Sequence, residues 1–151
     1  MIPSAVLDTN ATLDWLVFHD PAAQAFGRAI QAGRLRWLAS PAMRREFEQV
    51  LGRPALAAWV PDATAAAKAW DAHAQPAEAG LPAGLLRCTD PGDQMFIDLA
   101  LHARATWLLT RDRALLTLAG RAHAWGVRVT TPKAWEESRP MSALTPVFAA
   151  A

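Results

Sequence analysis

The sequence predicts an α/β fold in which a largely parallel central sheet is covered by helices on both faces. Short apolar runs alternate along the chain with longer segments whose apolar residues recur at helical spacing. Strands that are separated by helices pair in parallel, which places helices on both faces of the sheet. The 151 residues suffice for one domain, and a composition of 52% hydrophobic and 19% charged residues supports a buried core.

The first half of the chain is expected to contribute two strands, each followed by helices. Residues 5–7 form a short apolar strand, and helical spacing resumes over residues 10–18. Residues 20–33 form a second helix, with an Asp-Pro pair suited to its start and Gly33 suited to its end. A second apolar strand is expected at residues 35–40.

A third helix should follow this second strand without a loop. Ser40 can act as its N-cap, and Pro41 can occupy its first position. Residues 55–75 are rich in alanine and continue as helix, and a loop that contains Pro76 and Gly84 then separates the two halves of the chain.

The second half repeats the alternation of strand and helix. Residues 85–88 are expected to form a short strand, a turn follows at residues 90–92, and a helix begins near Asp93. Apolar runs at residues 107–109 and 127–129 predict two more strands.

The C-terminal end differs in composition from the remainder. Pro132 is suited to start a short helix, and the residues from 139 onwards contain two prolines and no clear period. We therefore assign residues 1–138 to the domain and residues 139–151 to a C-terminal tail.

Charge and cysteine content narrow the environment in which the protein acts. The net charge of +1 means that attraction to nucleic acid must come from local patches. The single cysteine, Cys88, rules out a disulfide within the chain and fits a reducing cytoplasm. The sequence contains no run of 18 apolar residues, so we expect no membrane-spanning segment.

Four acidic residues occupy comparable positions, at the carboxyl ends of predicted strands or early in the helices that follow. They are Asp8, Glu46, Asp93 and Asp112. Because the carboxyl ends of parallel strands share one edge of the sheet, we expect the four to converge. Carboxylates in one cleft raise one another's pKa values unless a cation is present, and Mg²⁺ or Mn²⁺ prefers such oxygen ligands. The pattern therefore predicts a metal-binding acidic site.

Each of these acids also has a purely structural explanation. Asp8 and Asp112 could cap the helices that follow them, and Asp93 could satisfy amide groups at a helix start. Glu46 could be a solvated acid in the first turns of its helix. Their joint placement favours the site.

Four short motifs, in this order, resemble the PIN domain family. They are VLDTN with Asp8, SPAMRREF with Glu46, DPGDQMFIDLA with Asp93, and WLLTRDRALL with Asp112. The similarity extends from about Ala5 to Trp135, and it is best with the bacterial PIN proteins that serve as toxin components of toxin–antitoxin systems. The resemblance implies a three-layer α/β/α sandwich and a metal-dependent ribonuclease, with these four acids as its catalytic and metal-binding residues.

Small polar residues and arginines extend the implied site. Asn10 and Thr110 match polar positions that line the same pocket, where they could hold a carboxylate or a water. Arginines beside two of the acids are candidate contacts to RNA phosphates; they are Arg44, Arg45, Arg111 and Arg113. The same arginines could instead be solvated charges on helix faces.

The chain departs from the family pattern at two positions. Relatives often carry a further acid at the position of Gly92, and some carry one at the position of Leu116, so the number of metal ions stays open. We place the neighbouring acids Asp90 and Asp98 outside the site.

The resemblance also implies a reaction, a substrate and partners. The reaction would be hydrolysis of RNA phosphodiester bonds by water with the help of Mg²⁺ or Mn²⁺, without a protein nucleophile. The implied partners are an RNA substrate, a cognate antitoxin protein and a second copy in a homodimer, in the cytoplasm. Trp59 and Trp125 are either core residues or contacts for such partners.

Two alternatives stay open at this stage. A catalytically silent PIN-like module would bind RNA or a protein without cleavage. A phosphatase resembling haloacid dehalogenases would use Asp8 as its nucleophile, although Asn10 breaks the motif of that class.

Overall fold

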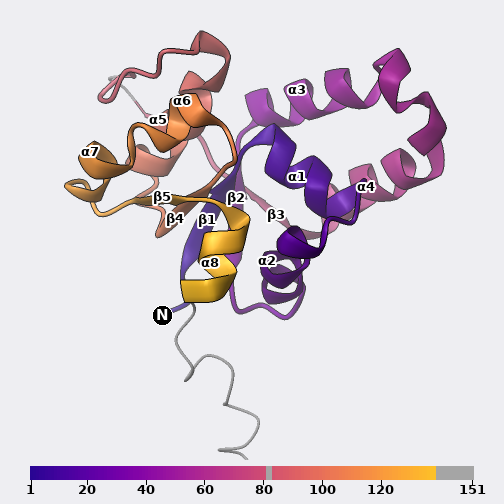
Figure 1. Cartoon of the computed structure of the whole chain (residues 1–151), viewed down its shortest axis with the longest axis horizontal. Coiled ribbons are helices and arrows are strands. Elements are labelled where there is room, and N and C mark those ends of the chain that lie inside the picture. The colour runs from indigo at the N-terminus through magenta and orange to yellow at the C-terminus, as the bar shows by residue number, and fades with distance from the viewer. Residues whose placement is uncertain (81–82, 139–151) are drawn as a thin grey trace, which may run out of the picture.

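Five parallel strands form the centre of the protein in the computed structural model, which describes residues 1–80 and 83–138 (Figure 1). The strands are β1 (Ser4–Leu7), β2 (Arg36–Ala39), β3 (Ala74–Pro76), β4 (Trp107–Leu109) and β5 (Arg128–Thr130). Their order in the sheet is β3-β2-β1-β4-β5. In the central strand, Val6 is aligned with Leu38 of β2 and with Leu108 of β4. The predicted parallel sheet is confirmed.

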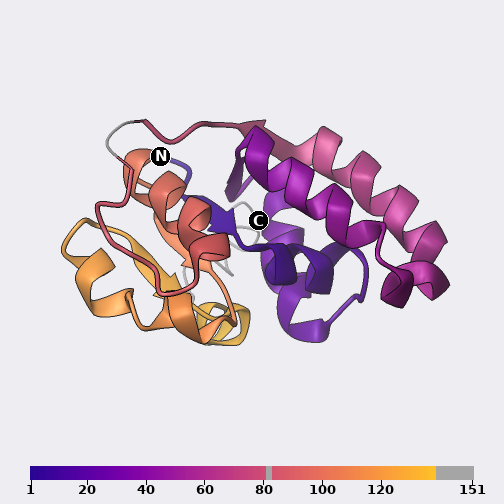
Figure 2. The ribbon, with the colours of Figure 1, turned by 90° about the horizontal axis from the view of Figure 1, so that it is seen from above.

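Helices cover both faces of this sheet, as the view from above shows (Figure 2). One side carries α1 (Thr9–Leu16), α2 (Pro21–Gln31), α3 (Pro41–Leu51) and α4 (Val60–His73). The other side carries α5 (Gln94–His102), α6 (Arg113–Leu116) and α7 (Ala119–His123). The structure also contains two 3-10 helices, η1 (Pro54–Trp59) between α3 and α4 and η2 (Pro91–Asp93) directly before α5. The last helix, α8 (Pro132–Ser138), follows β5. The arrangement is the expected three-layer α/β/α sandwich.

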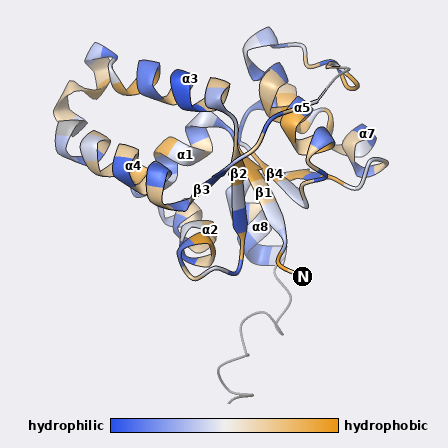
Figure 3. Ribbon diagram, turned by 180° about the vertical axis from the view of Figure 1, so that it is seen from behind, coloured by the Kyte–Doolittle hydropathy of each residue, from blue (hydrophilic) through white to orange (hydrophobic). Residues whose placement is uncertain are grey.

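The hydrophobic core lies on both sides of the central strands. Val6, Leu108 and Leu109 have no exposed surface, and Ile97 of α5 packs with them in the same buried cluster. Figure 3 shows the hydrophobic residues gathered on the strands and on α5. None of the described helices is long and apolar enough to cross a membrane.

Aromatic side chains fill the core between the sheet and α1, α2 and α4. The ring of Trp37 in β2 lies 5.3 Å from that of Trp15 and 4.7 Å from that of Trp70, between ring centroids. A Cβ atom at Gly27 would lie 2.1 Å from Nε1 of Trp15, so α1 and α2 can pack this closely only because residue 27 is glycine.

The remaining tryptophans divide between core and surface. Trp59 and Trp125 are 37% and 51% exposed, so neither is a core residue. Trp59 is the last residue of η1, the segment that joins the long helices α3 and α4 (Figure 1). Its ring contacts that of Phe18, and the centroids are 5.2 Å apart.

Local capping signals located several helix ends correctly. The side chain of Asp20 accepts a hydrogen bond at the start of α2, and that of Ser40 does so at the start of α3. Gly33 has a φ of +74° just beyond α2, the left-handed conformation that glycine adopts without strain.

The strand predicted at residues 85–88 is absent. Gln94 of α5 takes over the backbone groups that a neighbouring strand would have bound: its Nε2 donates to the carbonyl of Leu86, and its Oε1 accepts from the amide of Cys88, both at 2.8 Å. The fifth strand of the sheet is instead β3, which follows α4 directly and lies at one edge, beside β2. The tail assigned to residues 139–151 lies outside the described residues.

Candidate functional site

Asp8 follows β1 directly and begins α1. Its Oδ1 accepts a hydrogen bond from the amide of Ala11 at 2.8 Å, and its Oδ2 accepts one from the hydroxyl of Thr110 at 2.5 Å. The residue is only 3% exposed. Burial raises the pKa of Asp8 to about 6, although both hydrogen bonds oppose this rise. Asp8 is therefore a helix cap and also a buried carboxyl group at the carboxyl edge of the sheet.

Thr110 joins the ends of two neighbouring strands. It is fully buried just beyond β4, where its hydroxyl donates to Asp8 and accepts from the amide of Asp112 at 2.9 Å. One hydroxyl thus sets the position of the Asp8 carboxylate relative to the backbone of Asp112.

Three further carboxylates form an acidic cluster beside this pair. Asp90, Asp93 and Asp112 each bring one carboxylate oxygen to within 4.8 Å of the other two. Asp90 is the N-cap of η2, and Asp93 is the residue before α5. Asp112 begins α6, where its Oδ1 accepts from the amide of Ala114 at 2.8 Å.

The electrostatics of the acidic cluster are unbalanced. Burial, the hydrogen bond to Asp112 and the negative charges of the neighbouring aspartates together raise the pKa of Asp93 to about 7, and burial is the largest of these causes. Oδ2 of Asp93 is buried and has no hydrogen-bond partner among the described residues. Within the same residues, no lysine, arginine or histidine forms an ion pair with the cluster. The arrangement calls for bound protons or a bound cation.

This donor set fits a hard divalent cation. Carboxylate oxygens are the ligands that Mg²⁺ and Mn²⁺ prefer, and an unpaired buried oxygen is costly without such a partner. Asp90, Asp93 and Asp112 could hold the ion, and Asp8 is close enough for its charge to act on Asp93 and Asp112.

Glu46 lies outside the acidic cluster but is linked to the site. It belongs to α3, and its Oε2 accepts a hydrogen bond from the hydroxyl of Thr9, the neighbour of Asp8. Asn10 lies exposed in the first turn of α1, and its side chain forms no hydrogen bond within the part of the chain that is described.

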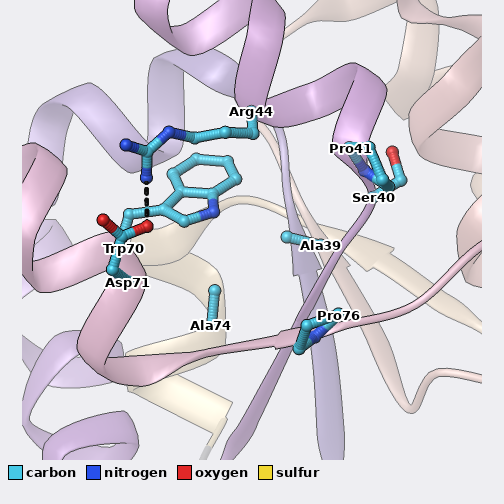
Figure 4. A pocket seen from close by; sticks show the side chains of 8 residues that line it. All are labelled: Ala39, Ser40, Pro41, Arg44, Trp70, Asp71, Ala74 and Pro76. Atoms are coloured by element: carbon cyan, nitrogen blue, oxygen red, sulfur yellow. Dashed lines mark hydrogen bonds and ion pairs between the residues drawn. The ribbon is translucent and has the colours of Figure 1, made fainter.

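Two of the four candidate arginines are held by acidic side chains of the protein. Nε of Arg111 donates to Oδ2 of Asp14 at 2.7 Å and its second nitrogen donates to Oδ1 at 3.1 Å. Arg44 lies over the ring of Trp70 and pairs with Asp71 at 2.8 Å (Figure 4). Arg44 also pairs with Glu48 at 2.9 Å.

The other two arginines are differently placed. Arg45 of α3 is exposed, Arg113 opens α6 directly after Asp112, and neither forms an ion pair with a described residue. The pocket that Arg44 helps to line, of about 210 Å³, lies instead beside the ends of β2 and β3 (Figure 4).

The structure brings together three of the four predicted acids, Asp8, Asp93 and Asp112, and places Thr110 between them. It also brings in Asp90, which sequence reasoning had placed outside the site. The Asp-Pro-Gly signal at this position predicts a turn, and the turn is present as η2. The missed signal was the spacing to Asp93, because residues three apart on a 3-10 turn lie on the same side.

Comparison with known proteins agrees with this architecture. A chain in the crystal structure of VapBC2 from Rickettsia felis bound to a DNA fragment from their promoter superposes with a TM-score of 0.60 at 11% sequence identity. The match covers 83% of this chain and 96% of that chain, and at this identity it shows the fold alone. No curated protein matches the sequence. Residues 4–114 match the PIN domain family. The chain belongs to the PIN domain family.

Proposed function

We propose that the protein is a metal-dependent ribonuclease and the toxin component of a toxin–antitoxin system. The observation that carries this proposal is the convergence of Asp8, Asp93 and Asp112 at one edge of the sheet, with a buried oxygen of Asp93 that no described residue pairs. PIN domains are generally nucleases, which supports the same conclusion.

The side chains of the site have separable roles in this proposal. When bound, Mg²⁺ or Mn²⁺ supplies positive charge to the phosphate and acidifies a water molecule. Asp93 and Asp112 would hold the ion, and Thr110 keeps Asp8 beside them through a hydrogen bond of 2.5 Å. No described histidine belongs to the cluster, so the side chains there that could accept the proton released from the attacking water are carboxylates.

The substrate would reach the site across an edge that carries free positive charge. Arg45 precedes Glu46 in α3, and Arg113 follows Asp112 at the start of α6. Neither arginine is neutralised by an acid of the described chain. Arg44 and Arg111 would need to break existing ion pairs before they could bind phosphate. We therefore expect the first two to contribute most of the phosphate contacts.

The toxin assignment and the partners rest on the structural similarity. The matching chain comes from a VapBC2 complex bound to promoter DNA, which supports a cognate antitoxin for this protein as well. We expect growth arrest on expression in a bacterial cytoplasm, relieved by co-expression of a small protein encoded next to the gene. Light scattering should give the mass of a homodimer.

The decisive experiment is cleavage of single-stranded and structured RNA in the presence of Mg²⁺ or Mn²⁺. Asp8→Asn and Asp112→Asn should each lower the cleavage rate by more than about 100-fold, because Asp112 would hold the cation and Asp8 lies close enough for its charge to act on the same acids. Asp62→Asn removes a partly exposed acid that pairs with His19 away from the site, and it should cleave at the wild-type rate.

Other outcomes would favour the alternatives. Cleavage that survives both substitutions would remove the assigned site, and RNA binding without cleavage on any substrate would favour a silent binding module. A covalent phosphate on Asp8 would indicate a phosphatase. Both oxygens of Asp8 already accept hydrogen bonds, from Ala11 and Thr110, which argues against that nucleophilic role.

A further inference from the structure

Asp90 and Glu46 stand in opposite relations to the acidic cluster. Asp90 contributes one of the three carboxylate oxygens that lie within 4.8 Å of one another, whereas Glu46 contributes none. The Glu46 carboxylate is engaged by the hydroxyl of Thr9 at the start of α1. The sequence pattern had assigned the two acids the other way round.

The segment that carries Asp90 is held firmly against α5. Gln94 binds the backbone of Leu86 and Cys88 with two hydrogen bonds of 2.8 Å. Gln94 is itself held at 2.9 Å by Asp98, a buried residue whose Oδ1 also accepts from the amide of Gly84 at 2.9 Å. These bonds hold the chain on both sides of Asp90 in a defined position without using its carboxylate.

One oxygen of the Asp90 carboxylate has no hydrogen-bond partner within the described chain. The other oxygen, Oδ1, accepts from the amide of Gly92 at 2.9 Å, which closes the turn before Asp93, and the side chain forms no ion pair with residues 1–80 or 83–138. Across the turn, the buried Oδ2 of Asp93 lacks any hydrogen-bond partner in the described chain. A cation held by both acids would neutralise two neighbouring charges and satisfy that oxygen.

We propose that Asp90 is a ligand of the divalent cation, together with Asp93 and Asp112, and that Glu46 acts outside the ligand set. This inference rests on the proposed metal-dependent function and specifies which residues bind the ion. Relatives often carry an acid at the position of Gly92, which this chain lacks. Asp90 would replace that acid, because it supplies a carboxylate on the same turn.

The test is direct titration of the metal-free protein with Mn²⁺ by calorimetry at pH 7.5. Asp90→Asn should weaken Mn²⁺ binding by about tenfold or more, since loss of a ligand costs at least as much as loss of a supporting residue. Asn keeps the Oδ1 that accepts from Gly92, and Asp90→Ser is a second variant that can still cap the turn. Glu137→Gln, an exposed acid of α8, is the matched control, and Glu46→Gln should stay within about threefold of wild type.

Thermal unfolding separates a ligand from a structural residue. Asp90→Asn should unfold at the wild-type temperature or above it without metal, because a repulsive charge is gone, and it should gain less from saturating Mn²⁺. Mn²⁺ affinity of both Asp90 variants within about threefold of wild type would overturn the proposal. The ribonuclease proposal would survive that result if Asp112→Asn still lost Mn²⁺ binding, whereas a wild-type protein that binds no Mn²⁺ would refute both.

Discussion

Asp8 and the acidic cluster of Asp90, Asp93 and Asp112 lie at the same edge of the sheet, but the protein treats them differently. Both oxygens of Asp8 are paired, one with a backbone amide and one with Thr110. In the cluster, Oδ2 of Asp93 is buried and finds no hydrogen-bond partner among the residues that the structure describes. The protein itself supplies the hydrogen-bond partners of Asp8, whereas the acidic cluster requires a bound proton or cation.

The candidate arginines divide in the same way. Asp14 holds Arg111, and Glu48 and Asp71 hold Arg44, so these two cations are neutralised within the fold. Arg45 and Arg113 have no such acid in the described part of the chain. Groups that the fold satisfies are expected to contribute to stability, and groups that it leaves unpaired are expected to contribute to binding.

The largest expected effect is on the pH dependence of stability without metal. Folding raises the pKa of Asp8 from 3.8 to about 6 and that of Asp93 from 3.8 to about 7. At a pH between the unfolded and the folded pKa of either group, the folded state therefore binds more protons than the unfolded state. The free energy of unfolding should therefore fall as pH rises from about 4 to 7, by up to roughly 3 kcal/mol from Asp8.

Urea unfolding in EDTA at a series of pH values measures this slope. Saturating Mn²⁺ should flatten it, because the cation replaces the protons in the cluster. Stability that rises with pH over this range would contradict the assigned pKa shifts.

Thr110→Val tests the side of the site that the protein completes. The substitution leaves Oδ2 of Asp8 and the amide of Asp112 without their partner. We expect a loss of about 1–3 kcal/mol in the free energy of unfolding and a loss of about 10- to 100-fold in RNA cleavage. Thr110→Ser retains the hydroxyl and should recover most of the cleavage rate, and equal rates for the Val and Ser variants would show that the hydroxyl does not position Asp8.

Asp93→Asn tests the other side and should change stability in the opposite direction. Asn can donate a hydrogen bond to Asp112 without a shared proton and removes one of the repelling charges. The metal-free protein should become more stable at pH 8 by about 1 kcal/mol, and the stabilisation by Mn²⁺ should disappear. A loss of stability without metal would place Asp93 among the groups that the fold satisfies.

The smallest effects are expected from the arginines. Arg45→Ala and Arg113→Ala should each weaken RNA binding and reduce the dependence of log K on log salt by about 0.7. Arg44→Ala should leave that dependence unchanged and cost about 0.5–1 kcal/mol of stability through its lost ion pairs. Fluorescence anisotropy with labelled RNA at several salt concentrations measures this dependence. An equal salt dependence for all three variants would refute the division of the arginines into paired residues and phosphate-binding residues.

The sequence alone predicted the features that depend on neighbouring residues. Helix starts were visible because the caps act over two or three residues, as Asp20 does on Ala22 and Asp8 does on Ala11. The convergence of Asp8 and Asp112 was also predictable, because parallel strands end at one edge. The strand expected at residues 85–88 failed because its backbone groups are bound by a side chain of α5.

Local pattern and composition thus determined the class of fold, the order of most of its elements and the acids at the strand ends, but not β3. Only the tertiary structure decided which charges are paired: Arg111 meets an acid 97 residues away, and Arg44 meets one 27 residues away. It also decided that Asp90 joins the acidic cluster whereas Glu46 binds Thr9. The physical reason is that pairing depends on distances across packed elements, which a pattern of neighbouring residues does not encode.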